Sequence, residues 1–172
     1  NSASISGGSS GHYIIKENID RPFGADDFKF TTNQIWSIYK DGSIELSASI
    51  SSNNATLVLP HIGYKLEIPT EFSNYNYYGR GPINNYADRK TAQNIEWNTS
   101  KVVNLFEPWP KPQSTGNREE VRWCGLTNAS GNGVAFIAKN DFAASALHWD
   151  ELQLTLAPHP YQLPKNTGTQ PY

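Results

Sequence analysis

Methionine is absent from the 172 residues, and cysteine occurs only once, at Cys124. A single cysteine excludes an intrachain disulfide framework. Its neighbours Trp123 and Leu126 belong to a strand-like apolar segment, in which a buried and unreactive thiol is expected. Because even position one is not methionine, we expect the chain to be an excised domain rather than a complete translation product.

Long apolar runs and clusters of basic residues are also missing. No segment approaches the roughly 18 consecutive apolar residues of a membrane-spanning helix, and the N-terminus does not combine a basic with an apolar stretch as a signal peptide does. The formal net charge is −2, and no run of Lys or Arg creates a field that attracts phosphate. We therefore expect neither nucleic acid nor a membrane as a partner, and the compartment is left open.

Known catalytic and metal-binding patterns are missing as well. No nucleophile elbow, phosphate-binding loop or dinucleotide fingerprint occurs. The glycines Gly79 and Gly81 are not followed by a helical pattern, so they indicate a turn rather than a phosphate cradle. We therefore predict no catalytic residue, no metal ligand and no cofactor in this chain. The four histidines lack the short spacings of a zinc site; they are His12, His61, His148 and His159.

The residues that are present favour β-structure. Residues 34–39 and 44–50 flank Lys40-Asp41-Gly42-Ser43, and an Asp-Gly pair supplies the positive φ angles of a tight hairpin turn. Apolar and polar residues alternate in residues 44–50, as in a half-buried strand.

Further strands and turns follow along the chain. Strands are predicted over residues 64–68, 102–106 and 120–126, and a second hairpin turn over residues 128–133. Only residues 150–156 are compatible with a helix. Eight or more short strands without βαβ alternation predict an all-β, antiparallel sandwich. The Ser- and Gly-rich residues 1–11 are predicted to be a linker or flexible N-terminus, followed by a single β-sandwich domain over residues 12–172.

Aromatic rings mixed with amide and guanidinium groups suggest contact with sugar or with another domain. Trp109 lies between two prolines in a predicted loop, which is the setting most suited to presenting a ring outward. His148 alternates with apolar residues and is expected to be a structural, hydrogen-bonded histidine or to face a cleft. The candidate sugar-facing or interdomain-facing residues are Arg80, Trp109, Asn117, Arg118 and His148.

Several short motifs, in order and spacing, resemble the C-terminal, small-chain domain of bacterial β-galactosidases of glycoside hydrolase family two. The resemblance covers residues from about 28 to 164. It departs at Asn84, where that family typically shows Glu, at Ala87 in place of Pro, and at Ser114-Thr115 in place of Glu-Asn. The motifs are Leu59-Pro60-His61-Ile62-Gly63, Gly79-Arg80-Gly81-Pro82, Asn85-Tyr86, Asp88-Arg89, Pro112-Gln113, Gly116-Asn117-Arg118, Val121-Arg122-Trp123, Leu147-His148 and His159-Pro160.

The resemblance implies a galactose-mutarotase-like supersandwich within a bacterial, cytoplasmic or periplasmic enzyme. In that family the acid/base and nucleophile glutamates lie on a separate (β/α)₈ barrel, so the expected partners are the other domains of the parent β-galactosidase. The family's loop into the sugar pocket ends in Asp-Ser-Trp-Gly, and no such sequence precedes Tyr172. No position is therefore carried over as catalytic.

Three functions remain open at this stage. The favoured one is a non-catalytic domain that supports or shapes the sugar site of a β-galactosidase, because the adjacent Glu119 and Glu120 point to opposite faces of a strand and cannot converge on one sugar. A carbohydrate-binding module with a galactoside ligand would need exposed, coplanar aromatic rings, and exposure of Trp109 would favour it. A mutarotase-like aldose epimerase would need His148 or His159 beside Glu107.

Overall fold

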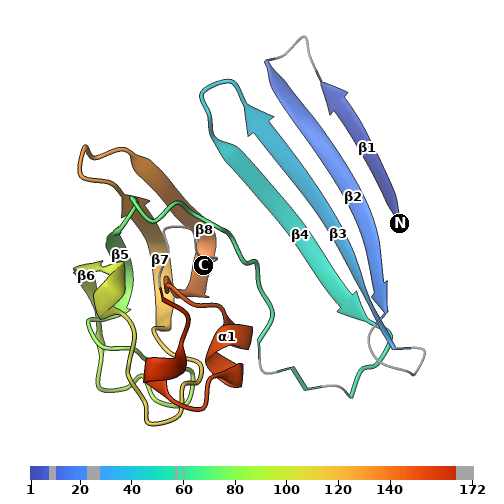
Figure 1. The fold of residues 1–172 in the computed structure, drawn as a ribbon. Coiled ribbons are helices and arrows are strands. Elements are labelled where there is room, and N and C mark those ends of the chain that lie inside the picture. Colours follow the sequence, from blue (N-terminus) through green and yellow to red (C-terminus); the bar gives the residue numbers. More distant parts are fainter. Residues whose placement is uncertain (8–10, 23–27, 57, 60, 166–172) are drawn as a thin grey trace. The chain divides into compact units, whose positions relative to one another are not determined.

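The computed structural model of the chain describes residues 1–7, 11–22, 28–56, 58, 59 and 61–165. It divides into two compact units, Asn1–Ile62 and Gly63–Tyr172, called unit 1 and unit 2 here. Each unit contains a four-stranded antiparallel sheet, and the strands can be followed in Figure 1. The predicted all-β, antiparallel fold class is confirmed. The single sandwich domain expected over residues 12–172 stays a prediction.

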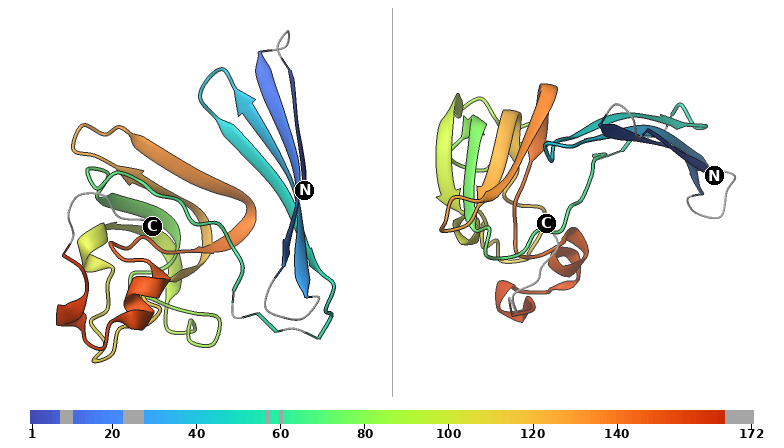
Figure 2. Two further views of the ribbon diagram at one scale, coloured as in Figure 1. Left: turned by 45° about the vertical axis from the view of Figure 1, so that its right-hand side comes forward. Right: turned by 90° about the horizontal axis from the view of Figure 1, so that it is seen from above.

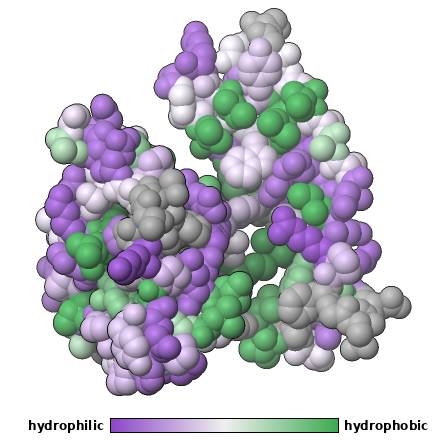
Figure 3. All heavy atoms as spheres, in the orientation of Figure 1, coloured by the Kyte–Doolittle hydropathy of each residue, from purple (hydrophilic) through white to green (hydrophobic). Residues whose placement is uncertain are grey.

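Unit 1 is a meander in which the strands pair in chain order. Its turn between β3 and β4 is the hairpin predicted from the Asp-Gly pair: Tyr39 N donates to Ser43 O at 2.9 Å, and Gly42 has a φ of 89°. Hydrophobic residues lie among these strands on the face seen in Figure 3. The strands are β1 (Ser2–Gly7), β2 (His12–Pro22), β3 (Lys29–Tyr39) and β4 (Ile44–Ser52).

Part of the predicted N-terminal linker is a strand. Residues Ser2–Gly7 form β1, which pairs with β2 from Ser2 opposite Asn18 to Gly7 opposite Tyr13. The side chains of β1 are exposed, as the low apolar content of the segment predicts. An edge strand is held by backbone hydrogen bonds, which need no apolar side chain. Residues 8–10 of the predicted linker lie outside the described residues.

In unit 2 the strand order is β6-β5-β7-β8, so β5 lies between the strand that follows it and a strand much later in the chain (Figure 2). The predicted second hairpin joins β7 to β8, where Asn128 N donates to Asn132 O at 2.8 Å. The strands are β5 (Asn74–Gly81), β6 (Asn94–Lys101), β7 (Arg118–Thr127) and β8 (Gly133–Ala144).

The helical prediction is confirmed, and two predicted strands are wrong. Helix α1 spans Glu151–Leu156, and Asp150 caps it by accepting from Gln153 N at 2.7 Å. Residues 102–106 begin instead with the 3₁₀ helix η1 (Val102–Asn104), because the Val102 side chain is buried in the core while its carbonyl accepts from Leu105 N. Residues 64–68 form no named strand. A second 3₁₀ helix, η2, spans Pro160–Gln162.

One face of the β5–β8 sheet carries the core of unit 2. Tyr75 and Tyr77 of β5 stack with ring centroids 5.1 Å apart and pack with Cys124 and Leu126 of β7. Leu154 of α1 joins the same cluster. Burial raises the pKa of the Cys124 thiol to about 11, so the prediction of a buried cysteine is confirmed and the thiol is held in its unreactive form.

Candidate functional site

Two of the motifs that carry the family resemblance meet at one end of the β5–β8 sheet. The first includes Arg80 at the end of β5 and Asn85 in the segment that follows. The second includes Asn117 and Arg118, at the start of β7. Asn85 N donates to Asn117 O at 2.9 Å, and Asn117 Nδ2 donates back to Asn85 O at 2.8 Å. This reciprocal pair joins segments that are more than thirty residues apart in the chain.

The side chain of Asn85 is the centre of this network. It is fully buried, and its amide nitrogen donates to the carbonyl oxygens of Arg80 at 3.0 Å and Ile83 at 2.9 Å. Its amide oxygen accepts from Glu119 N at 2.8 Å. The Asn amide carries two N–H donors and a separate acceptor oxygen, so it can make all three bonds at once. Asn85 belongs to one of the motifs that carry the resemblance but is not among the five candidate residues, although an Asn in a Gly- and Pro-containing turn is a recognised signal for such backbone bonding.

Arg118 lies beneath this network and is only 4% exposed. Its Nε donates to Tyr77 Oη at 3.0 Å, and its Nη1 donates to the carbonyl oxygens of Gly116 at 3.0 Å and Asn117 at 3.2 Å. Burial raises the pKa of Tyr77, and the nearby Arg118 charge opposes that shift. Arg118 therefore links the core tyrosine to the loop before β7, and its sugar- or domain-facing role stays a prediction.

Arg80 belongs to a charged group formed by Glu120, Arg80 and Lys90, called the Glu120 triad here. Arg80 Nε lies 2.9 Å from Glu120 Oε2, and Lys90 Nζ lies 2.8 Å from Glu120 Oε1. Arg80 Nη1 also donates to the carbonyl oxygen of Gln93 at 2.6 Å. The hydrogen bond from Lys90, followed by the contact with Arg80, lowers the pKa of the Glu120 carboxyl.

The backbone at Glu120 is unusual for a residue with a side chain. Its φ is 53°, in the left-handed region, and the pairing of β7 with β8 shifts register on both sides of Val121. Such bulges redirect side chains. Arg80 is among the five candidate residues, whereas Glu120 and Lys90 are not, because nothing in the local pattern indicates a left-handed glutamate.

Asn84, at one of the positions that depart from the resembling family, makes a polar contact in this chain. Arg89 Nη2 donates to Asn84 Oδ1 at 2.6 Å, and the Arg89 guanidinium lies 4.6 Å from the centroid of the Tyr86 ring. Asn84 is buried. A neutral amide therefore occupies the position where the resembling family shows a carboxylate, and its oxygen accepts from Arg89.

Trp109 and His148 have other surroundings. Trp109 lies in a loop and is 36% exposed, and its backbone N–H donates to Glu107 O at 2.8 Å. The His148 ring meets the Trp149 ring edge to face at 6.1 Å, and partial burial lowers the pKa of His148. His159 Nδ1 lies 3.4 Å from the carbonyl oxygen of Pro110. The structure thus joins three of the five candidate residues, Arg80, Asn117 and Arg118, in one network. The contacts given above for Trp109 and His148 are not part of that network.

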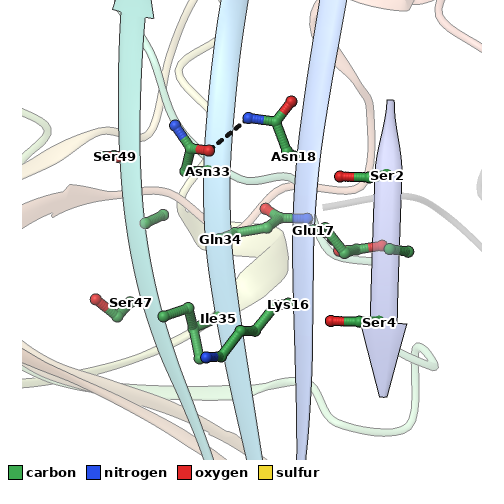
Figure 4. Close-up of a pocket in the computed structure, with 12 residues that line it drawn as sticks. Ser2, Ser4, Lys16, Glu17, Asn18, Asn33, Gln34, Ile35, Ser47 and Ser49 are labelled. Atoms are coloured by element: carbon green, nitrogen blue, oxygen red, sulfur yellow. Dashed lines mark hydrogen bonds between the residues drawn. The ribbon is translucent and has the colours of Figure 1, made fainter. Parts of the chain in front are cut away.

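A shallow hollow of about 410 Å³ lies on the sheet of unit 1 (Figure 4). Hydroxyl, amide and charged groups from all four strands line it, among them Ser4, Lys16 and Ser47. Asn18 Nδ2 donates to Asn33 Oδ1 at 2.5 Å within it. None of the five candidate residues chosen from the sequence lines this hollow.

Within the part of the chain that the structure describes, no group of three or more His, Cys, Asp or Glu side chains is placed to hold a metal ion. Among the same residues, no helix has the length and apolar character to cross a membrane. The predictions of no metal and no cofactor stay predictions.

Comparison with known proteins places the chain in a family. Residues 6–170 match the family model described as β-galactosidase small chain. The chain is 30% identical over 129 residues to a β-galactosidase of Priestia megaterium, a match that covers 75% of this chain and 12% of that protein.

Two further relatives agree. The chain is 34% identical over 126 residues to the β-galactosidase BgaC of Bifidobacterium adolescentis and 35% identical over 126 residues to a β-galactosidase of Lactobacillus delbrueckii subsp. bulgaricus. These matches cover 72% and 73% of this chain, and 12% of each relative. The chain thus spans about an eighth of the length of the curated relatives it matches. It belongs to the β-galactosidase small chain family.

Proposed function

We propose that this chain is the non-catalytic C-terminal domain of a family-two glycoside hydrolase, a β-galactosidase that removes terminal non-reducing β-D-galactosyl groups. The observation that carries the proposal is the family match over residues 6–170, combined with the 12% share of the relatives' length. Other domains of the parent enzyme are then its partners, and this domain supports or shapes the sugar site.

The partners of the adjacent carboxylates support a non-catalytic role. Glu119 Oε1 accepts from Asn117 Nδ2 at 2.7 Å, while Glu120 is held by Arg80 and Lys90. A retaining glycosidase needs two carboxyl groups roughly 5 Å apart around one sugar, one of them protonated to act as the acid. The lowered pKa of Glu120 keeps it ionised at neutral pH, so it is not suited to donate that proton.

The Asn85 network supports a structural role for the shared motifs. The three side-chain hydrogen bonds of Asn85 and the three of Arg118 go to groups within unit 2. These motifs therefore fix how β5 and β7 end and begin. A galactoside or a neighbouring domain is most easily reached by Trp109, whose ring is the most exposed of the five candidate side chains.

The test compares hydrolysis of a chromogenic β-galactoside by the isolated chain and by the full-length enzyme. The chain alone is expected to show no turnover above a blank, whereas the full-length enzyme hydrolyses the substrate. A full-length variant carrying Trp109→Ala is expected to change KM, or to lower stability, if Trp109 faces the sugar or a neighbouring domain. Turnover by the purified isolated chain would contradict the proposal. Interconversion of galactose anomers by the chain would instead support the epimerase.

A further inference from the structure

Four large apolar side chains form a continuous row across the β5–β8 sheet. Tyr78 of β5 pairs with Trp97 of β6 on one side and with Trp123 of β7 on the other. Trp123 in turn pairs with Ile137 of β8. Directly opposed residues in antiparallel strands project from the same face of a sheet. The four residues, called the aromatic row here, therefore share one face and extend over all four strands of this sheet.

The aromatic row lies on the face opposite the core of unit 2. Side chains alternate along β5, and its buried Tyr75 and Tyr77 belong to the core face, so Tyr78 points the other way. Trp97 is 65% exposed and Ile137 is 81% exposed. The rings of Trp97 and Trp123 lie 4.7 Å apart, which makes the row a contiguous apolar ridge rather than scattered residues. A contiguous exposed apolar surface of this kind marks a site of interaction.

The chemistry of the row favours a protein surface over a sugar. The planes of Trp97 and Trp123 are inclined by 58°, so they do not form the flat platform on which a sugar chain would stack. Ile137, the most exposed member, has no ring to offer a pyranose. Arg80, two residues after Tyr78 on β5, lies beside the row and pairs with Glu120 at 2.9 Å. Tryptophan, tyrosine and arginine are the residues that concentrate at the centres of protein interfaces.

We propose that the aromatic row packs against a segment of the parent β-galactosidase polypeptide that lies outside these 172 residues. The inference rests on the proposed function and adds to it the surface through which this domain is attached. Its second support is length: the matched region is only 12% of each of three relatives, so most of such a polypeptide is available to cover the row. The occupant is an apolar protein surface, not a solvated ligand.

Hydroxyl-radical footprinting of the isolated chain and of the full-length enzyme tests this proposal. Tryptophan oxidation is read from the mass of the peptides that carry Trp97 and Trp123. The Trp97 peptide is expected to oxidise readily in the isolated chain and roughly fivefold more slowly in the full-length enzyme, because interface cores are packed as closely as protein interiors. Tyr75, which is buried within unit 2, should react slowly in both and serves as the internal control.

A matched pair of variants provides an independent measurement. Ile137→Lys places a charge in the row, and Val103→Lys places one at an exposed position of η1, where the side chain is 64% exposed. Both isolated variants should unfold within about 2 °C of the unmodified chain, since surface substitutions rarely change stability much. In the full-length enzyme only Ile137→Lys is expected to lower the unfolding temperature and the yield of active protein.

Equal oxidation of Trp97 in the two forms would overturn the proposal. So would protection of Trp97 already present in the isolated chain, because the row would then be covered within residues 1–172. Protection of the isolated chain that appears only with added lactose would assign the row to a sugar instead. The proposed function fails separately: if the full-length protein does not hydrolyse a β-galactoside, that proposal is wrong even where Trp97 is protected.

Discussion

Replacing Asn85 provides the most direct test of the network that joins the two motifs. Asn85→Ala removes two donor contacts, to the carbonyl oxygens of Arg80 and Ile83, and one acceptor contact, from Glu119 N. A hydrogen bond contributes about 1 kcal/mol, and a buried group left without a partner costs about 1 to 3 kcal/mol. The free energy of unfolding of unit 2 should therefore fall by about 3 to 5 kcal/mol.

Asn85→Asp tests the donor contacts separately, because it keeps the shape of the side chain and replaces only the amide nitrogen by an oxygen. One carboxylate oxygen can still accept from Glu119 N, but the other faces the two carbonyl oxygens to which the amide donated. Burial beside acceptors raises the folded-state pKa of the new carboxyl above its unfolded value of about 3.9. The variant is then least stable near neutral pH, and its deficit relative to the unmodified chain should narrow as the pH falls towards about 4.

Urea unfolding followed by tryptophan fluorescence measures both variants, because four of the five tryptophans lie in unit 2, the fifth being Trp36. Asn140→Ala, at an exposed position of β8, serves as the control and should shift stability by less than about 0.5 kcal/mol. A loss below about 1 kcal/mol for Asn85→Ala would refute the reasoning that its hydrogen bonds hold the motifs together.

Three further predictions concern other parts of unit 2. The pKa of Glu120 is lowered in the folded state, so its ion pairs stabilise the fold above the ordinary pKa of 4.5, and this stabilisation is lost as the pH falls through the folded-state pKa. Unfolding measured across the acid range should show a weaker pH dependence of stability for Glu120→Gln than for the unmodified chain. An unchanged pH profile would contradict this prediction. The pKa of Cys124 is raised to about 11 from an ordinary 9.0, so its thiol should be modified roughly 100-fold faster in urea than in the native chain at about pH 8. A colorimetric thiol reagent measures both rates. Equal rates would show that the thiol is not buried. Gly79→Ala would place a Cβ 2.8 Å from Val121 Cα and should lower the free energy of unfolding in urea by about 1 to 3 kcal/mol. Gly63→Ala, whose Cβ would have nothing within 4 Å, should change it very little. Similar losses of stability for both variants would contradict the close approach of Gly79 to Val121.

Local chemistry predicted the turns and the helix well. The Asp-Gly turn after β3 follows from the need for a positive φ, which Gly42 supplies. The start of α1 follows from Asp150 and Gln153, which bond to each other's backbone in a capping box. In each case the residues that determine the structure are within four positions of one another, so the sequence pattern contains the whole cause.

Features that depend on tertiary contacts could not be predicted from the local sequence pattern. Strand β1 is held by backbone hydrogen bonds to β2, and the side chains of β1 contribute no apolar burial. Asn85 was passed over because its partners at positions 117 and 119 are close only after folding. The hydrogen bond from Arg118 to the Tyr77 hydroxyl had no local signal either, because the two residues are 41 positions apart in the chain. The left-handed φ of Glu120 had no local signal, because residues with bulky side chains rarely adopt it.

The strand order of the two sheets has a consequence for how the chain folds. The meander of unit 1 needs only contacts between neighbours in the chain, so its strands can associate early and quickly. The central pair of unit 2, β5 and β7, must instead close over residues 82–117 before the Asn85 bonds can form. Because β1–β4 precede β5–β8 in the chain, we expect unit 1 to assemble first during synthesis from the N-terminus, and closure of the β5–β7 pair to be the slower step.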